Sequence, residues 1–181
     1  MHVEKKRQVQ EGSTSMLMFG KLIDYFDSSQ SGREESGLGR WVVMTLKGET
    51  TTRVICGYNP CGNKRPNSGM VYHQQRQYSI LKPGYLTCPR VKFREDLVEQ
   101  LQRWRAQGDK LIVCLDANED VYKKSIGKEL TSADGLAMKE VVGTFTGKRI
   151  GPMYFQGSKP IDAVWATSDI QVAGACIMPA G

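Results

Sequence analysis

Residues 111–118, LIVCLDAN, decide the fold: five apolar residues run directly into Asp116 and Asn118. A short apolar run bounded by polar residues is typical of a strand that is buried on both faces of a sheet. Because Asp116 and Asn118 are two residues apart, their side chains point to the same side at a strand end. A carboxylate and an amide in this arrangement can hold a hard cation and orient a phosphate or a water beside it.

Two further segments place a polar side chain within or at the end of an apolar strand. The segment IDAVWA, residues 161–166, encloses Asp162, whose charge needs an ionic partner or a metal to offset its desolvation. The segment TRVICGYNP, residues 52–60, predicts a strand that ends in Tyr58. A tyrosine is a rigid hydrogen-bond donor that stays neutral near pH 7. The sequence therefore offers three strand-end side chains suited to a phosphate.

The composition fits one soluble globular domain. The chain has 181 residues, of which 40% are hydrophobic and 24% charged. No apolar run approaches the roughly 20 residues that a membrane helix needs, and no apolar segment follows the basic residues of the N-terminus. We therefore expect neither a membrane span nor a signal peptide. The net charge of +6 suits a polyanionic partner, although many soluble proteins carry a similar excess.

The five cysteines favour a reduced compartment. Cys56 and Cys114 lie inside apolar runs, where a free cysteine behaves as a small hydrophobic residue. An intracellular location is the expectation, with the nucleus as one option. Cys56, Cys61, His73 and Cys88 match none of the compact zinc spacings. His73 and His2 are the two histidines, and neither lies near a carboxylate that would make it a general base.

Periodicity and turn residues predict the remaining elements. We expect a flexible polar tail over 1–12 and one domain over 13–181. Its first half should contain a short buried strand at 15–19, an exposed loop at 24–37 and a hairpin of 41–46 with 52–57. An irregular stretch at 59–89 should enclose a helix at 72–81. Helices are expected through 93–104 and 132–142, with strands at 110–115 and 161–166.

Strands that alternate with helices after a hairpin predict an α/β or α+β architecture with a mixed sheet. The order is a strand ending in Tyr-Asn-Pro, a helix, a strand ending in Asp-x-Asn, and a strand carrying Ile-Asp. Over residues 13–178 this order resembles the second half of the endonuclease/exonuclease/phosphatase superfamily. That superfamily comprises metal-dependent phosphodiesterases, including apurinic-site endonucleases and retrotransposon endonucleases. The resemblance implies a two-sheet αββα sandwich of the DNase I-like type. We expect Tyr58, Asp116, Asn118 and Asp162 to converge on one end of it, at the mouth of a cleft.

The resemblance also implies roles for individual residues. Asp116 would engage the attacking water, and Asn118 would contact the scissile phosphate. The Tyr58 hydroxyl would donate to the phosphate, and Asp162 would orient the metal and phosphate ligands and serve as the metal residue. The implied cofactor is Mg²⁺ or Mn²⁺. Arg40, in a segment similar to endonuclease-like domains of mobile elements, would contact a phosphate, although a solvated arginine is the commoner case.

Simpler interpretations of the same residues stay open. Asp116 can cap a turn in which Asn118 is left-handed, since both residues favour such positions. Asp162 can be a strand-edge carboxylate paired with a lysine or arginine such as Lys159. Tyr58 can be a half-buried strand residue with its hydroxyl in water.

The family completes its site with an early asparagine, a metal-binding glutamate and a C-terminal Asp-His pair, none of which we assign here. Glu11 lies just after the position where the glutamate would fall. We therefore expect a domain that is incomplete at both ends and weak or inactive as a phosphodiesterase on nucleic acid, DNA rather than RNA. A reverse transcriptase fused to it or encoded nearby is the partner that the mobile-element resemblance implies.

Two alternative functions remain. One is a non-catalytic nucleic-acid-binding or interaction domain that retains the fold. Its phosphate contacts would come from the basic residues around the helix at 93–104, namely Arg90, Lys92, Arg94, Arg103 and Arg105. The other is a lipid or phosphoinositide phosphodiesterase of the same superfamily.

Overall fold

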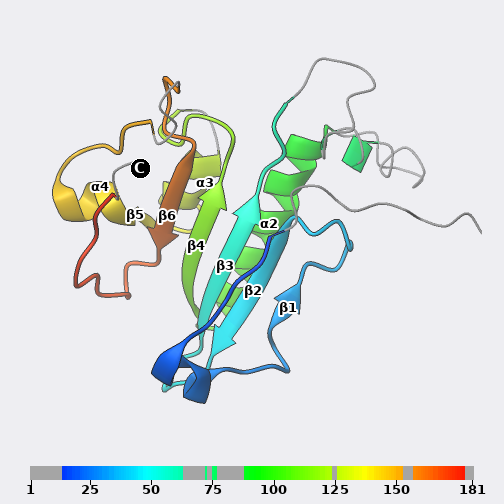
Figure 1. Cartoon of the computed structure of the whole chain (residues 1–181), viewed down its shortest axis with the longest axis vertical. Coiled ribbons are helices and arrows are strands. Elements are labelled where there is room, and N and C mark those ends of the chain that lie inside the picture. Colours follow the sequence, from blue (N-terminus) through cyan, green and yellow to red (C-terminus); the bar gives the residue numbers. More distant parts are fainter. Residues whose placement is uncertain are drawn as a thin grey trace, which may run out of the picture.

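The computed structural model describes residues 14–62, 72, 75–76, 88–123, 126–152 and 157–177. A six-stranded mixed sheet forms its centre, with the strand order β1-β2-β3-β4-β6-β5 (Figure 1). The strands are β1 (Gly32–Arg33), β2 (Trp41–Leu46), β3 (Thr52–Tyr58), β4 (Lys110–Asp116), β5 (Lys139–Glu140) and β6 (Asp162–Ala166). The helices are the 3-10 helix η1 (Gly20–Tyr25), α2 (Pro89–Ala106), α3 (Ile126–Thr131) and α4 (Val141–Thr146). The predicted tail at 1–12 and nearly all of the predicted helix at 72–81 lie outside the described residues.

The strand pairing confirms a mixed α/β sheet. Strands β2 and β3 form the predicted antiparallel hairpin, and β3 pairs with β4 in parallel. A parallel pair needs a crossover connection, and α2 lies in the segment that joins the two strands. Strand β6 then pairs antiparallel with both β4 and β5. As a result, the carboxyl ends of β3 and β4 and the start of β6 lie at the same end of the sheet (Figure 1).

Helix α2 covers one face of this sheet, as the periodicity predicts. Phe93, Leu97 and Leu101 are four residues apart and fully buried. Pro89 lies in the first turn of α2, where the backbone N–H groups have no partner within the helix, so its missing N–H costs no hydrogen bond. Gly108, with a left-handed φ of 87°, follows the end of the helix. The Phe93 ring meets Trp41 of β2 edge to face, with the ring centroids 5.8 Å apart. The core therefore lies between α2 and the sheet.

The predicted buried strand at 15–19 is wrong. Residues 14–19 are extended but join no strand of the sheet, and only alternate residues, such as Met16 and Met18, are half-buried. Leu17 and Phe19 point outward and are 82% and 75% exposed. Every second residue of this segment is therefore half-buried, while the residues between them stay in solvent.

The predicted exposed loop at 24–37 is also partly wrong, because it contains β1 and two buried carboxylates. Asp27 accepts hydrogen bonds from the backbone and hydroxyl of Ser29, and Glu34 accepts from Ser36 and Arg40. Burial of a carboxylate is tolerated where several donors replace its water. Local hydrogen bonds of this kind are not visible in hydropathy.

The predicted helix at 132–142 is replaced by a turn, β5 and α4. Ala137 has a positive φ of 48°, which an α-helix does not allow. Glu140 caps α4, since its carboxylate accepts from the backbone N–H groups of Val142 and Gly143. A helix that starts after this cap cannot include the residues before it.

The other face of the sheet is apolar, and no second sheet covers it in the described part of the chain. Register aligns half-buried side chains across it, among them Val42, Cys56, Cys114 and Val164. We call this the open face. The described residues thus form one of the two sheets that the resemblance implies. Among these same residues, no helix has the length and apolarity to cross a bilayer.

Candidate functional site

Three of the predicted site residues lie side by side at one end of the open face. Tyr58 of β3 is in register with Asp116 of β4, and Asp116 is in register with Asp162 of β6. Side chains of residues in register on neighbouring strands project from the same face of a sheet. The strand order led us to expect that these residues converge, and the strand pairing brings the three of them into one row. Their catalytic roles remain predictions.

The row borders a cavity of about 440 Å³ on the open face. Tyr58, Asp116 and Asp162 line it together with apolar residues, including Val142 and Ile150. A carboxylate beside an apolar wall keeps fewer waters than one at a free surface. The surroundings of the row therefore disfavour negative charge.

The two carboxyl groups respond to these surroundings. Burial raises the pKa of Asp116 above its ordinary value, and the negative charge of Asp162 raises it further. Burial also raises the pKa of Asp162. Hydrogen bonds from Asn118 and the positive charge of Arg90 act in the opposite direction on the pKa of Asp116, but they are the smaller effects. The site therefore disfavours ionisation of both groups, through burial for Asp162 and through burial and the neighbouring charge for Asp116.

This donor set fits a hard divalent cation. Mg²⁺ and Mn²⁺ prefer carboxylate oxygens, and a cation between Asp116 and Asp162 would cancel the repulsion of the two charges. The ion pairs of the described residues include neither Asp162 nor its predicted partner Lys159. The pairing interpretation of Asp162 is therefore wrong.

Asn118 forms a tight turn directly after β4. Its φ of 48° is left-handed, and its backbone N–H donates to Oδ1 of Asp116 at 3.1 Å. The turn interpretation is confirmed, and it agrees with a role in the site, because this bond uses one oxygen of Asp116. The side-chain Nδ2 of Asn118 donates to the carbonyl of Asn59 at 2.8 Å, which occupies one of its two N–H groups.

Asn59, which the sequence analysis did not select, connects the same two loops. Its side chain is 1% exposed, and its Nδ2 donates to the carbonyl of Ala117 at 3.0 Å. Its backbone N–H donates to the carbonyl of Asp116 at 2.9 Å. The buried Oδ1 of Asn59 has no hydrogen-bond partner in the described part of the chain. The signal in the sequence was the Asn that follows the strand-ending Tyr58.

Arg40, the predicted phosphate contact, is committed to the interior. Its side chain is 4% exposed, and its Nη2 lies 3.0 Å from Glu34 and 2.9 Å from Asp96. Its guanidinium also stacks on Trp41, with the carbon 4.8 Å from the ring centroid. A buried cation needs such partners to offset its lost hydration. Both expectations for Arg40, a phosphate contact and a solvated side chain, are therefore wrong.

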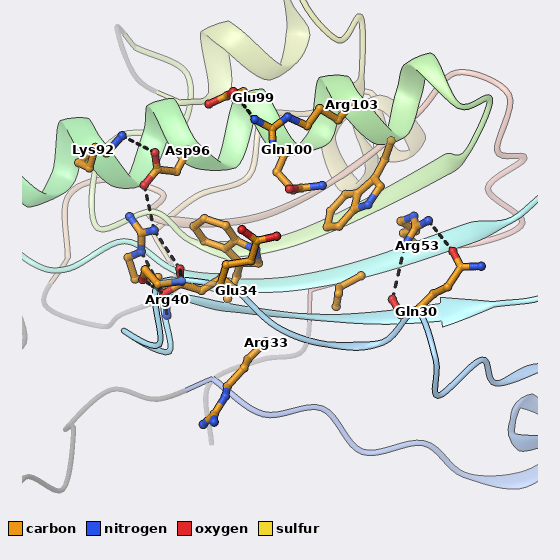
Figure 2. A pocket seen from close by; sticks show the side chains of 15 residues that line it. Gln30, Arg33, Glu34, Arg40, Arg53, Lys92, Asp96, Glu99, Gln100 and Arg103 are labelled. Carbon is orange, nitrogen blue, oxygen red and sulfur yellow. Dashed lines mark hydrogen bonds and ion pairs between the residues drawn. The ribbon is translucent and has the colours of Figure 1, made fainter.

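Arg40 belongs to a charged groove of about 550 Å³ between β2 and α2 (Figure 2). Figure 2 shows that Lys92 reaches Asp96 and that Arg103 reaches Glu99, whereas Arg33 points away from these pairs. Arg53 at the other end of the groove pairs with Asp109 at 2.5 Å. Because Arg40, Arg53, Lys92 and Arg103 are ion-paired, these four cations of the groove are not free to bind a phosphate chain.

The basic residues of α2 are ion-paired as a group. Arg90, Lys92, Arg94, Arg103 and Arg105 each lie within hydrogen-bonding distance of a carboxylate, at 2.5–3.0 Å. An ion-paired arginine or lysine must break a contact before it can bind a phosphate. The stripe of phosphate contacts that the sequence suggested as an alternative is therefore not free in this structure.

The described residues contain no cluster of three or more His, Cys, Asp or Glu that could hold a metal. The five cysteines are free thiols, and burial raises the pKa of the Cys56 and Cys114 thiols. His73 of the rejected zinc set lies outside the described residues. The row of Tyr58, Asp116 and Asp162 is thus the strongest candidate site.

No family model and no curated protein matches the sequence. Among solved structures, the catalytic domain of human Nocturnin with bound sulfate is similar at a TM-score of 0.45 and 16% identity, over 71% of this chain and 41% of that chain. Beta toxin from Staphylococcus aureus is similar at a TM-score of 0.37 and 10% identity, over 71% of this chain and 43% of that chain. The chain spans less than half the length of either protein. Likenesses at this level assign no residue role to it.

Proposed function

We propose that Tyr58, Asp116, Asp162 and Asn118 form a divalent-cation-dependent phosphodiester site of the endonuclease/exonuclease/phosphatase type, acting on nucleic acid, DNA rather than RNA. The observation that carries the proposal is the register that aligns Tyr58 with Asp116 and Asp116 with Asp162. Two carboxylates, a phenol and an amide can hold a divalent cation, orient a water and donate hydrogen bonds to a phosphate. The strand and motif order of the sequence supports the same conclusion.

Each side chain has a distinct task in this proposal. Asp116 accepts a proton from a water at its free carboxylate oxygen and orients that water, a task for which a raised pKa suits a carboxylate near neutral pH. The Tyr58 hydroxyl and the second Nδ2 hydrogen of Asn118 donate hydrogen bonds to phosphate oxygens. When Mg²⁺ or Mn²⁺ is bound, Asp162 would hold it, the negative charge of the adjacent Asp116 would favour it, and it would neutralise charge that builds up on the phosphate.

The proposal includes low activity for this chain. Two carboxylates hold a divalent cation weakly, with a dissociation constant on the order of 1 mM. The net charge of +6 attracts DNA, but the basic residues of α2 are already ion-paired. Binding to DNA should therefore be weak, independent of base sequence, and reduced by salt. Cleavage is expected to be slow.

Cation binding gives the most direct test. With a dissociation constant of about 1 mM, 10 mM Mn²⁺ should stabilise the folded chain by roughly 1.4 kcal/mol. We expect the melting temperature to rise with Mn²⁺ for the wild type and to stay constant for Asp162→Asn. Asp134→Asn, which changes an exposed carboxylate, is the matched control and should behave as the wild type. A wild-type melting temperature that does not respond to Mn²⁺ would rule out the site.

Cleavage assays separate the alternatives. A nicked-plasmid assay should show cleavage close to background, and any cleavage above background should be lost in Asp116→Ala. Robust nicking by Asp116→Ala would contradict the assignment of the general base. Hydrolysis of phosphoinositide or sphingolipid vesicles in preference to DNA would instead favour the lipid phosphodiesterase. The non-catalytic DNA-binding alternative predicts salt-sensitive binding that Mn²⁺ and Asp162→Asn leave unchanged.

A further inference from the structure

Arg90 makes more contacts with the site loops than any role in phosphate binding would explain. It lies in the first turn of α2, and its side chain is 18% exposed. Nη1 donates to the carbonyl of Pro60 at 2.6 Å. Nη2 donates to the carbonyls of Ala117 and Asn118 at 3.3 Å each, and to Oε2 of Glu119 at 2.8 Å. One guanidinium thus serves three backbone carbonyls and one carboxylate.

These acceptors belong to the two loops that carry the site. Pro60 follows Tyr58 after β3, while Ala117 and Asn118 form the turn after β4. The bonds of Asn59 and Asn118 described above cross between the same loops, and Arg90 joins both to the start of α2. Because Asn118 in turn holds Oδ1 of Asp116 through its backbone N–H, the orientation of Asp116 depends on this turn.

Glu119 extends the connection to a third element. While its Oε2 accepts from Arg90, its Oε1 accepts from the backbone N–H of Ile126, the first residue of α3, at 3.1 Å. The loops are therefore held between two helices that pack on the covered face of the sheet. The side chain of Glu119 keeps the guanidinium of Arg90 charged and in place.

We propose that Arg90 is a positioning residue of the site, which fixes Asn118 and thereby Asp116 by tying the loop after β3 to the turn after β4. The inference deepens the proposed function and rests on it. The role requires an arginine, because a planar fork of two nitrogens can serve acceptors on both loops at once. A lysine carries the same charge on a single nitrogen, which can serve one loop but not both.

The first test is made without cation or substrate. Backbone amide exchange is measured by NMR in the wild type, in Arg90→Lys and in Arg94→Lys. Arg94 is the matched control, since it lies one turn later on α2 and pairs with Glu129 at 2.8 Å without contacting the site loops. We expect exchange at the Asn118 amide to accelerate at least about tenfold in Arg90→Lys, the effect of losing a charge-assisted hydrogen bond. Arg94→Lys should leave it unchanged.

The second test measures whether Arg90 affects the affinity of the site for Mn²⁺. The Mn²⁺ concentration that gives half of the maximal thermal shift should rise about tenfold in Arg90→Lys and stay at the wild-type value in Arg94→Lys. Urea denaturation of both variants separates this local effect from a general loss of stability. A purely structural Arg90 would lower stability without changing the Mn²⁺ midpoint, and that result would overturn the proposal.

The outcomes distinguish this inference from the proposed function. If the wild type shows no response to Mn²⁺, the cation site fails, and the exchange result still decides whether Arg90 holds the turn. Unchanged exchange at Asn118 in Arg90→Lys would refute the positioning role. Should that variant not fold, Glu119→Gln removes the charged partner of Arg90 and keeps the side-chain volume. It should accelerate the same amide by a smaller factor, and no acceleration there would equally refute the role.

Discussion

Replacing Asp116 by Asn is expected to make the chain more stable at neutral pH. Asp116 and Asp162 are directly opposite each other on β4 and β6, and the pKa of both is raised by burial. Asn keeps the Oδ1 that accepts from the Asn118 amide at 3.1 Å, and it removes the negative charge. The substitution therefore removes both the cost of burying the Asp116 charge and the repulsion between the two carboxylates.

The size of the effect follows from the strand geometry. Opposite side chains of an antiparallel pair have Cβ atoms about 5 Å apart. Unit charges about 6 Å apart repel by roughly 0.7 kcal/mol at the dielectric constant of water, about 80, and by roughly 2.8 kcal/mol at the value of about 20 that applies near a protein surface. Half-exposed carboxylates lie towards the lower end of this range. We expect Asp116→Asn to raise the free energy of unfolding by about 1 kcal/mol at pH 7, which corresponds to roughly 2–4 °C in Tm.

The gain should depend on pH in a defined direction. Because the pKa of Asp116 is raised in the folded chain, the folded chain retains a proton over a pH window in which the unfolded chain has lost it. The stability contributed by this group is complete below the unfolded pKa of about 3.9, and it is lost as the pH rises through the folded pKa. Asp116→Asn avoids that loss, so its advantage should be full at pH 7 and absent in acid.

Urea denaturation of the wild type and Asp116→Asn at a series of pH values measures this difference. Asp134→Asn removes one exposed carboxylate and controls for the change in net charge. Two results would refute the reasoning. One is a variant that is less stable than the wild type at pH 7, and the other is a gain of the same size at every pH. The first would mean that the charge of Asp116 is already compensated inside the folded chain. The second would mean that the gain does not come from this charge.

Three further predictions concern other parts of the chain. Asp109→Ala should lower the free energy of unfolding by about 3 kcal/mol, because it leaves the buried guanidinium of Arg53 unpaired; a loss under 1 kcal/mol in urea would show that Arg53 finds another partner. Asn118→Ala should be about 1 kcal/mol less stable than Asn118→Gly, since its φ is 48°; equal urea midpoints would contradict a left-handed turn. Leu17→Ser combined with Phe19→Ser should change the free energy of unfolding by less than about 0.5 kcal/mol, because these side chains are 82% and 75% exposed. It should also raise the concentration at which light scattering detects aggregates, and unchanged scattering would mean that this segment does not drive association.

The sequence predicts β3, β4 and α2 because their buried residues recur at a regular spacing along the chain. In β3 and β4 every second residue is buried, and in α2 every fourth is, as at Phe93 and Leu97. The strand order also led us to expect that Asp116 and Asp162 converge at one end of the domain, but no local pattern gives their register. Their adjacency depends on how β6 pairs with β4, and this pairing is a long-range choice that no local pattern encodes.

What the sequence misses depends on contacts between distant segments. From the sequence Arg40 resembles a surface arginine, because its ion pairs with Glu34 and Asp96 form only in the folded chain. Arg90 looks like a basic residue of a helix, and its acceptors lie about 30 residues away on both sides. The predicted helix at 132–142 fails for a nearer reason, because Glu140 caps the helix that follows it. Hydropathy carries no information on any of these partners.

Successive side chains of a strand point to opposite faces of the sheet. This alternation explains both where the row lies and why the open face is apolar. On β4 the residues that face α2 are Leu111, Val113 and Leu115, so Cys114 and Asp116 must project from the opposite face. The carboxylates therefore stand at the end of an apolar surface, and this surface is what raises their pKa. Any layer that covers the open face would remove more water from Asp116 and Asp162 and increase the penalty of leaving them both ionised. A cation between them would then be held more tightly, so the affinity of the site for Mg²⁺ or Mn²⁺ is coupled to the cover on the sheet.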